Sequence, residues 1–164
     1  MSSQVDVENL DAGYDELQVL SQVSFSLEPG QIGCMLGPSG CGKTTVLRAI
    51  AGFEPAWGGS ILIDRVLVSS AATCLVPEKR NVGMVFQDFA LFPHLNVEDN
   101  VCFGLKGMAP KEQQIRVQEM LAIVGMPAYA QAWPHQLSGG QQQRIALARA
   151  LAPTSYCSVN TLLW

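Results

Sequence analysis

Short apolar runs separated by turn signals occupy the first part of the chain. Three of them have the length of a strand: VDVENL (residues 5–10), LQVLSQVSFSL (17–27) and IGCML (32–36), with an EPG turn (28–30) after the second. Apolar alternation over such lengths favours strands, because successive side chains of a strand point to opposite faces. The pattern therefore predicts three β-strands here.

The periodicity becomes helical after a glycine-rich stretch. The segment KTTVLRAIAG (43–52) places Val46, Leu47 and Ile50 on one face and ends at Gly52. Three- and four-residue apolar spacing is typical of an amphipathic helix, and a glycine often terminates one. We expect a strand, a glycine loop and a helix in that order.

The remaining pattern turns from strands to helices. It predicts a hairpin that includes ILIDRVLV (61–68), a short buried strand in VGMVFQ (82–87), and helices over VEDNVCFGL (97–105), KEQQIRVQEMLAIVG (111–125) and QQQRIALARAL (141–151). A proline two residues after the last segment stops that helix. The chain is therefore expected to be an α/β protein, with strands in its first half and helices in its second.

Composition narrows the possible classes of protein. The chain has 164 residues, of which 48% are hydrophobic, so it suits one well-cored domain. Its formal net charge of -4 disfavours a nucleic-acid partner. No apolar run approaches the roughly 18 residues of a membrane span, and the N-terminus lacks the layout of a secretion signal. The five cysteines have no metal-ligand spacing. We expect a cytoplasmic protein without zinc or disulfides.

The stretch GPSGCGKT, from Gly37 to Thr44, matches the phosphate-loop pattern G-x-x-x-x-G-K-[ST]. It lies after a predicted strand and opens a predicted helix, where backbone N–H groups and the helix N-terminus attract anions. We predict that Lys43 reaches the β and γ phosphates of ATP and that Thr44 ligates Mg²⁺. The alternative is a glycine-rich turn that binds nothing. The motif alone is also shared by kinases, GTPases and motor ATPases.

A second candidate phosphate site is LSGGQ, Leu137 to Gln141. Ser138 is placed to cap the following helix, and the amides of Gly139 and Gly140 would lie at the helix N-terminus. By itself this stretch would be interpreted as an ordinary helix cap. A phosphate loop about a hundred residues upstream favours a nucleotide role.

From Val5 to Pro153 the sequence resembles the ATP-binding subunits of ABC (ATP-binding cassette) transporters. GPSGCGKTT resembles the phosphate loop of the family, Gln87 in VGMVFQD its Q-loop glutamine, and LSGGQQQR its signature motif. Tyr14 falls where the family places an aromatic that stacks on adenine. Further stretches are similar to bacterial importers of ferric iron, polyamines, sulfate and sugars, and AGFEPAWGGSI and DFALFPHLNV are most similar to the ferric-iron importers.

The resemblance implies a phosphate-loop NTPase core of the ABC type, with an antiparallel β subdomain and a helical subdomain. It implies one domain, in which residues 1–87 form the β subdomain and phosphate-loop core, 88–136 the helical subdomain, 137–153 the signature loop and helix, and 154–164 a tail unlike the family. Lys43 and Gln87 would be catalytic, and Thr44 and Gln87 would bind Mg²⁺. The nucleotide-binding residues would be Tyr14, Gly37, Pro38, Ser39, Gly40, Cys41, Gly42, Lys43, Thr44 and Thr45, and the signature residues acting on a second subunit would be Leu137, Ser138, Gly139, Gly140 and Gln141.

The resemblance also implies partners. Two copies would pair head to tail with ATP between them, the signature of one covering the γ-phosphate held by the other. The dimer would attach to transmembrane permease subunits at the inner face of the plasma membrane, and through them serve a periplasmic or lipoprotein solute-binding protein. ATP hydrolysis would drive uptake of a solute, with ferric iron as the first expectation.

The stretch after Pro153 departs from the family, which continues with a hydrophobic strand and an Asp-Glu pair. Here TSYCSVNTLLW follows, and no acidic residue occurs after Glu119. We therefore expect the C-terminal part of the core, the general-base Glu and the switch histidine to be missing, and hydrolysis to be very weak. A frameshift within the gene is our hypothesis for the change: if Ser155 is encoded as AGY, another frame permits a tail that resembles a degraded family strand.

Two alternatives stay open at this stage. The chain could be a non-enzymatic, frameshifted remnant that at most binds nucleotide, which a turnover measurement would distinguish. It could also be a DNA-repair or chromosome-maintenance ATPase, but such proteins insert coiled coils or zinc modules between the two motifs. The segment from Gln87 to Leu137 shows neither heptads nor paired cysteines.

Overall fold

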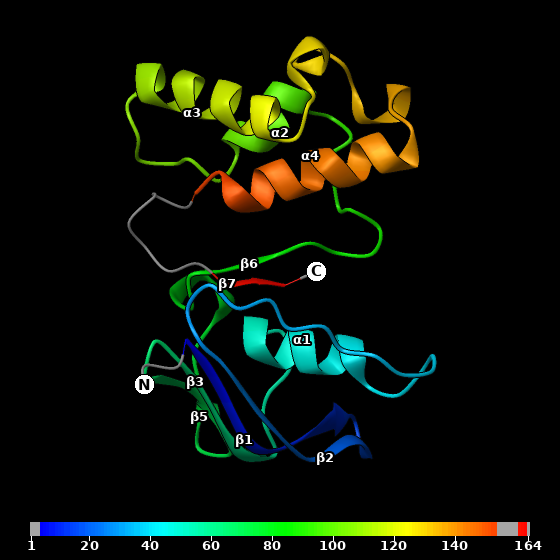
Figure 1. Cartoon of the computed structure of the whole chain (residues 1–164), viewed down its shortest axis with the longest axis vertical. Helices are drawn as coiled ribbons and strands as arrows, with labels where there is room; N and C mark the ends of the chain where they lie inside the picture. Colours follow the sequence, from blue (N-terminus) through cyan, green and yellow to red (C-terminus); the bar gives the residue numbers. More distant parts are fainter. Residues whose placement is uncertain (1–3, 154–160, 164) are drawn as a thin grey trace. The chain divides into compact units, whose positions relative to one another are not determined.

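The computed structural model of the chain describes residues 4–153 and 161–163 (Figure 1). The chain divides into two units, and the main division falls between Val82 and Gly83. Strand β7 (Thr161–Leu163) is grouped with the first unit. The expected non-family tail, residues 154–164, lies outside the described residues except for the backbone of β7, which pairs with β6 (Val82–Met84) in a two-stranded sheet.

The first unit is built on an antiparallel sheet in the order β2-β1-β3-β4-β5. Its strands are β1 (Val5–Tyr14), β2 (Leu17–Leu27), β3 (Gly58–Ile63), β4 (Val66–Ser70) and β5 (Thr73–Cys74). The apolar alternation noted in the sequence accounts for the buried face, because Val5, Val7 and Leu10 of β1 are almost fully buried. The first two predicted strands are confirmed: β2 has the predicted bounds, and β1 continues four residues beyond the predicted stretch, to Tyr14.

The predicted hairpin is β3–β4. Ile63 pairs with Val66, and the two residues between them, Asp64 and Arg65, both have positive φ, 49° and 66°. Two left-handed residues in a two-residue loop match the right-handed twist of the flanking strands. The turn chemistry was not prominent in the sequence, since neither residue is glycine.

Helix α1 (Lys43–Ala51) contacts β1 and β2 in the first unit. Its buried face contains Val46, Ala49 and Ile50, and Gly52 ends it in a left-handed conformation with φ 95°. The sequence predicted this helix and its glycine terminator correctly.

The predicted strand at residues 32–36 is wrong. The chain from Gln31 to Pro38 has no regular secondary structure, and the side chains of Ile32 and Leu36 are 95% and 89% exposed. A strand exists only where a neighbour completes its hydrogen-bond ladder, and no described strand pairs with this segment. The strand expected over 82–87 is likewise limited to Val82–Met84, because a turn begins at Phe86.

The second unit is helical. It contains α2 (Val97–Cys102), α3 (Pro110–Ile123) and α4 (Gly139–Leu151), with the 3₁₀ turns η2 (Pro127–Tyr129) and η3 (Pro134–Gln136), and a further turn, η1 (Pro77–Lys79), precedes it. The three predicted helices are confirmed. Asn96 caps α2 by accepting a hydrogen bond from the Asp99 amide at 2.8 Å.

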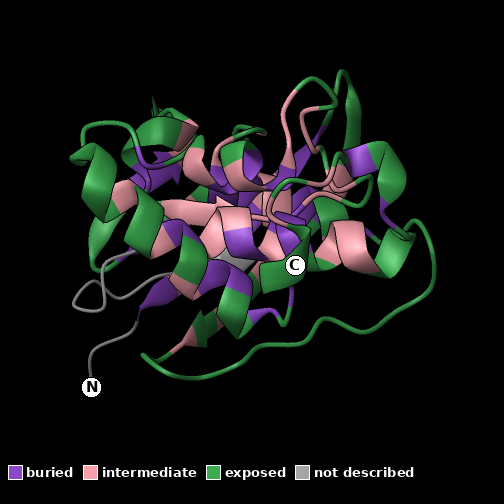
Figure 2. Ribbon diagram, turned by 90° about the horizontal axis from the view of Figure 1, so that it is seen from above, coloured by how far each residue is buried: buried purple, intermediate pink, exposed green. Residues whose placement is uncertain are grey.

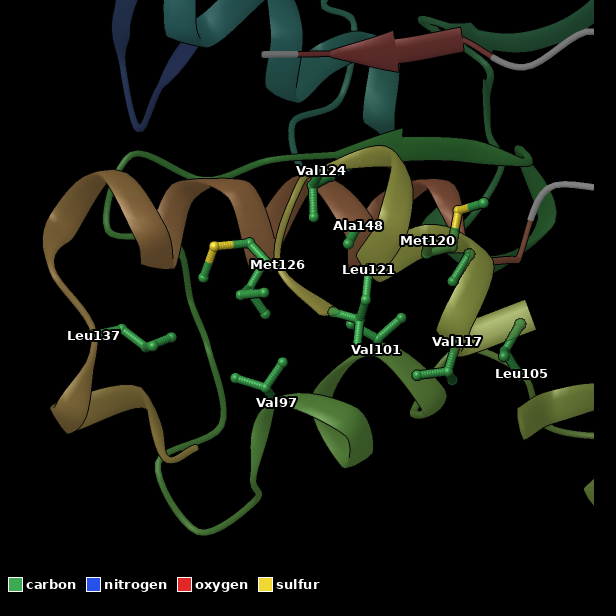
Figure 3. Packing of buried hydrophobic residues seen from close by; sticks show 12 residues of the cluster. Val97, Val101, Leu105, Val117, Met120, Leu121, Val124, Met126, Leu137 and Ala148 are labelled. Atoms are coloured by element: carbon green, nitrogen blue, oxygen red, sulfur yellow. The ribbon is translucent and has the colours of Figure 1, made fainter. Parts of the chain in front are cut away.

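One cluster of apolar side chains holds the helices of this unit together (Figure 3). Val97, Val101 and Leu105 recur every four residues and face Val117 and Leu121 of α3. Ile145 and Ala148 of α4 are fully buried in the same cluster. Figure 2 shows the complementary pattern, in which exposed positions lie on the outward sides of the helices and along the loops. Among the described residues, no helix is long and apolar enough to cross a membrane.

Candidate nucleotide-binding site

The loop before α1, in the first unit, owes its backbone conformation to its own glycines. Gly40 and Gly42 have φ values of 84° and 91°, in the left-handed region that side chains rarely adopt. Gly42 is also the N-cap of α1, and a Cβ there would lie 2.6 Å from Leu20. The sharp entry into the helix therefore needs glycine on conformational and steric grounds.

Lys43 folds back over this loop. Its ammonium donates hydrogen bonds to the carbonyls of Gly37 and Pro38 at 2.9 and 2.8 Å, and Cys41 Sγ lies at 3.5 Å. The loop from Gly37 to Cys41 is exposed, so the positive charge is accessible to solvent. The lysine thus lies where a phosphate on the loop would meet both it and the first amides of α1.

The two threonines of the motif have different surroundings. Thr44 is exposed in the first turn of α1, whereas Thr45 is 4% exposed and donates from Oγ1 to the Tyr14 hydroxyl at 3.3 Å. Tyr14 itself, at the end of β1, keeps 39% of its surface exposed. The contact joins the predicted adenine-stacking residue to the phosphate-loop helix, a link that sequence spacing alone did not indicate.

Arg80 supports the far end of the same helix and was missed by sequence reasoning. Its guanidinium is buried and donates to the carbonyls of Ala49 and Ile50 at 2.7 and 3.0 Å and to Leu75 at 2.8 Å. Burial lowers the pKa of Arg80, partly offset by the nearby Cys74 thiol. Cationic side chains near a helix C-terminus can bond its last carbonyls. Arg80 therefore stabilises the C-terminal end of α1, the end opposite the phosphate loop.

The signature stretch lies in the second unit and starts α4. The Ser138 hydroxyl accepts from the Gln141 amide at 3.4 Å, and the Gln141 carboxamide oxygen accepts from the Ser138 amide at 2.8 Å. This is the reciprocal capping box that places a helix start firmly. Leu137 is 6% exposed and belongs to the apolar cluster (Figure 3), so it anchors the loop.

Gly139 and Gly140 are not explained by the cap. Neither has positive φ, and a Cβ added to either would meet no atom within 4 Å. Glycine in a helix is less favourable than alanine by up to about 1 kcal/mol. Since neither conformation nor packing requires these glycines, they leave the first amides of α4 open to an approaching group.

Two amide side chains that the sequence analysis did not single out hold loops of the second unit: Gln142 holds the signature loop, and Asn100 holds the loop before α2. Gln142 donates to the carbonyls of Pro134 and Leu137 at 3.0 and 3.2 Å, and so ties the signature loop to α4. Asn100 is fully buried. Its side-chain oxygen accepts from the Phe92 backbone amide at 2.8 Å, and its side-chain nitrogen donates to the Phe92 carbonyl at 3.1 Å. A buried polar side chain within an apolar helix pattern was the available signal for Asn100.

Gln87 lies in an exposed turn of the second unit. The Phe86 carbonyl accepts from the Phe89 amide at 2.9 Å, which makes Gln87 and Asp88 the central residues of that turn. The structure thus brings Tyr14, Lys43, Thr44 and Thr45 together in one unit, and places Gln87 and the signature residues in the other.

A glycine-rich loop of this kind, which runs directly into a helix N-terminus, defines a phosphate-binding class of protein. Comparison with known proteins identifies which one: a model of the ABC transporter family matches residues 20–157. The chain belongs to the ABC transporter family.

Curated relatives of the chain are import ATP-binding proteins. It is 50% identical over 153 residues to the putative 2-aminoethylphosphonate import ATP-binding protein PhnT of Salmonella typhimurium, covering 92% of this chain and 40% of the relative. It is 46% identical to the spermidine/putrescine import protein PotA of Thermotoga maritima, over 93% and 41%. Identity to an Fe(3+) import protein, FbpC 2, of Haemophilus influenzae is 48%, over 90% and 42%. The chain therefore spans about two fifths of the length of these relatives.

Solved structures place the fold in the same family. The dimeric ATP-binding cassette MJ0796 in a post-hydrolysis state with ADP and Pi matches with a TM-score of 0.77 and 33% identity, over 91% of this chain and 69% of that one. The protein cbiO1 of Clostridium perfringens matches with a TM-score of 0.78 and 26% identity, over 93% and 62%. The expected α/β fold with an antiparallel sheet and a helical part is confirmed.

Proposed function

We propose that the whole protein is the ATP-binding, energy-coupling subunit of a bacterial ABC importer, and that this chain carries residues that bind the nucleotide. The observation that carries the proposal is the pair of open amide-rich helix starts. One has Lys43 folded over its loop, and the other has two glycines that neither φ nor packing requires. Anions bind at such helix N-termini.

The described residues fit a nucleotide with its metal. In the first unit, Lys43 would supply a cation to the phosphates and the exposed Thr44 a hydroxyl to Mg²⁺. In the second unit, the exposed Gln87 would offer an amide oxygen. Tyr14 keeps an exposed ring beside the loop, which suits stacking on a base. When bound, Mg²⁺ would neutralise charge on the phosphates, and these side chains would orient it.

The partners of the proposal follow from the relatives. Solved matches are described as dimers, which supports a head-to-tail pair with the signature of one copy on the nucleotide of the other. Import proteins named for 2-aminoethylphosphonate, polyamines and ferric iron match at 46–50% identity. The proposal therefore includes permease subunits, a solute-binding protein and attachment at the inner membrane face, and it names the importer class without choosing ferric iron among the solutes.

Calorimetry with Mg-ATP tests the nucleotide proposal on this chain. Lys43→Ala removes the charged donor and should weaken binding at least about tenfold, as expected for charge-assisted hydrogen bonds. Lys79→Ala, an exposed lysine of the same unit, should leave affinity unchanged. Folded parent chain without measurable Mg-ATP binding, or equal affinities in the three proteins, would contradict the proposal. ATP turnover measured in the same samples separates an active chain from one that only binds.

A further inference from the structure

The turn that carries Gln87 continues into two unusual backbone conformations. Phe89 and Ala90 have φ values of 60° and 43°, so two consecutive non-glycine residues are left-handed. Side chains with a Cβ disfavour this region, and such residues persist only where their surroundings hold them. The interactions that hold this pair therefore control how the Gln87 turn is presented.

The side chain of Arg149, on α4, makes the interactions that hold Phe89 and Ala90. Its Nη1 donates to the Ala90 carbonyl at 2.6 Å and its Nη2 to the Phe89 carbonyl at 3.0 Å. The guanidinium also lies 5.3 Å from the centroid of the Phe92 ring, within cation–π range. One planar group thus spans two adjacent carbonyls and an aromatic face, a geometry that arginine can satisfy and lysine cannot.

The position of Arg149 on α4 connects this turn to the signature stretch. Helix α4 starts at Gly139, so Arg149 lies about 15 Å along the axis from the exposed glycines. Between them Ile145 and Ala148 are fully buried in the apolar cluster, which holds the helix as one rigid element. Burial lowers the pKa of Arg149, and the two carbonyls offset the loss of water around its charge.

We propose that Arg149 is a positioning residue, which fixes the Gln87 turn to the helix that bears the signature glycines. Because of this link, a group bound at the N-terminus of α4 and a metal or phosphate held by Gln87 act on one rigid body. The functional part of the inference rests on the proposed nucleotide role, whereas the link itself can be tested without nucleotide.

Amide hydrogen exchange tests the link directly. Arg149→Lys keeps a charge but loses the paired donors, so the Phe89 amide, bonded to Phe86, should exchange about tenfold faster. Arg144→Lys changes an exposed arginine of the same helix and should leave that rate unchanged. Ala90→Gly in the Arg149→Lys chain makes the left-handed conformation easier and should restore part of the protection. Equal Phe89 exchange in the parent and the Arg149→Lys chain would overturn the proposal.

A double-mutant cycle with Mg-ATP tests the functional consequence. Gln87→Ala and Arg149→Lys should each weaken Mg-ATP binding by roughly three- to tenfold, and the double variant should be no weaker than the weaker single one. Additive losses, with melting curves equal to the parent, would show that Arg149 does not act through Gln87. Absence of Mg-ATP binding by the parent would reject the nucleotide role, and the exchange result would still decide the link.

Discussion

Arg80 shows what a single buried charge does in this chain. The residue is 2% exposed and its side chain donates to three carbonyls, two of which, Ala49 and Ile50, lie in the last turn of the phosphate-loop helix. A buried carbonyl without a donor costs about 1–3 kcal/mol. The residue therefore stabilises α1 through the hydrogen bonds it completes more than through its charge.

Replacing Arg80 by Met should lower the free energy of unfolding by about 2–3 kcal/mol, because it keeps the apolar stem but removes the side-chain donor to these carbonyls, of which that of Ala49 keeps only the Gly52 amide, at 3.3 Å. Urea denaturation measures the change. Lys79→Met, at the exposed neighbouring position, should alter stability by less than about 0.5 kcal/mol. Equal effects of the two substitutions would mean that the carbonyl contacts do not matter.

At the scale of elements, the N-terminus of α4 is fixed by a capping box, yet its first backbone amides are left uncovered by side chains. The capping box between Ser138 and Gln141 fixes where the helix begins, and Gln142 ties the preceding loop. Immediately inside that cap, two exposed glycines weaken the helix without a structural need. This combination is expected where an element has kept room for a ligand at the expense of stability.

Gly139→Ala should therefore stabilise the fold slightly, by up to about 0.5–1 kcal/mol, while it weakens nucleotide-dependent pairing of two chains. Thermal unfolding gives the first effect, and analytical ultracentrifugation with and without Mg-ATP gives the second. Ala146→Gly makes the reverse substitution at a buried position of α4. As a control it should lower the stability of the fold without a specific effect on nucleotide-dependent pairing. A Gly139→Ala chain that is less stable than the parent would contradict our account of this glycine.

At the scale of the whole molecule, the two units have separate apolar interiors. Among the described residues, the cluster of the second unit is built from α2, α3, α4, the loops between them, and Ala152 directly after α4. The buried apolar residues described in the first unit come from the sheet and α1, apart from Ala56 in the loop before β3. A defect in one interior should therefore be felt mainly in its own unit.

Leu121→Ala tests this separation. Leu121 is fully buried among the helices, and its truncation should cost about 2–5 kcal/mol through lost burial and a cavity. Hydrogen exchange should accelerate in α2, α3 and α4 and stay near the parent rate in β1 and β3. Uniform acceleration through both units would show that they unfold as one cooperative body.

The candidate site was predicted from the sequence more accurately than the strands around it were. The phosphate loop, Ser138 as helix cap and the helix end at Gly52 were predicted, because glycine conformation and side-chain capping act within a few residues. The stretch at 32–36 was wrong, since a strand depends on a partner that local pattern does not reveal. Predicted roles for Tyr14, Gln87 and the signature residues stay predictions.

What the sequence alone determined is the family, the helices and the two amide-rich loops, all of which follow from short-range spacing and turn chemistry. Tertiary structure alone decided the contacts across long separations: Thr45 on Tyr14, Arg80 on the end of α1, and Arg149 on the turn after Gln87. Residues up to about sixty positions apart meet in these contacts. Their pairing depends on how packed elements bring side chains together, which no local pattern encodes.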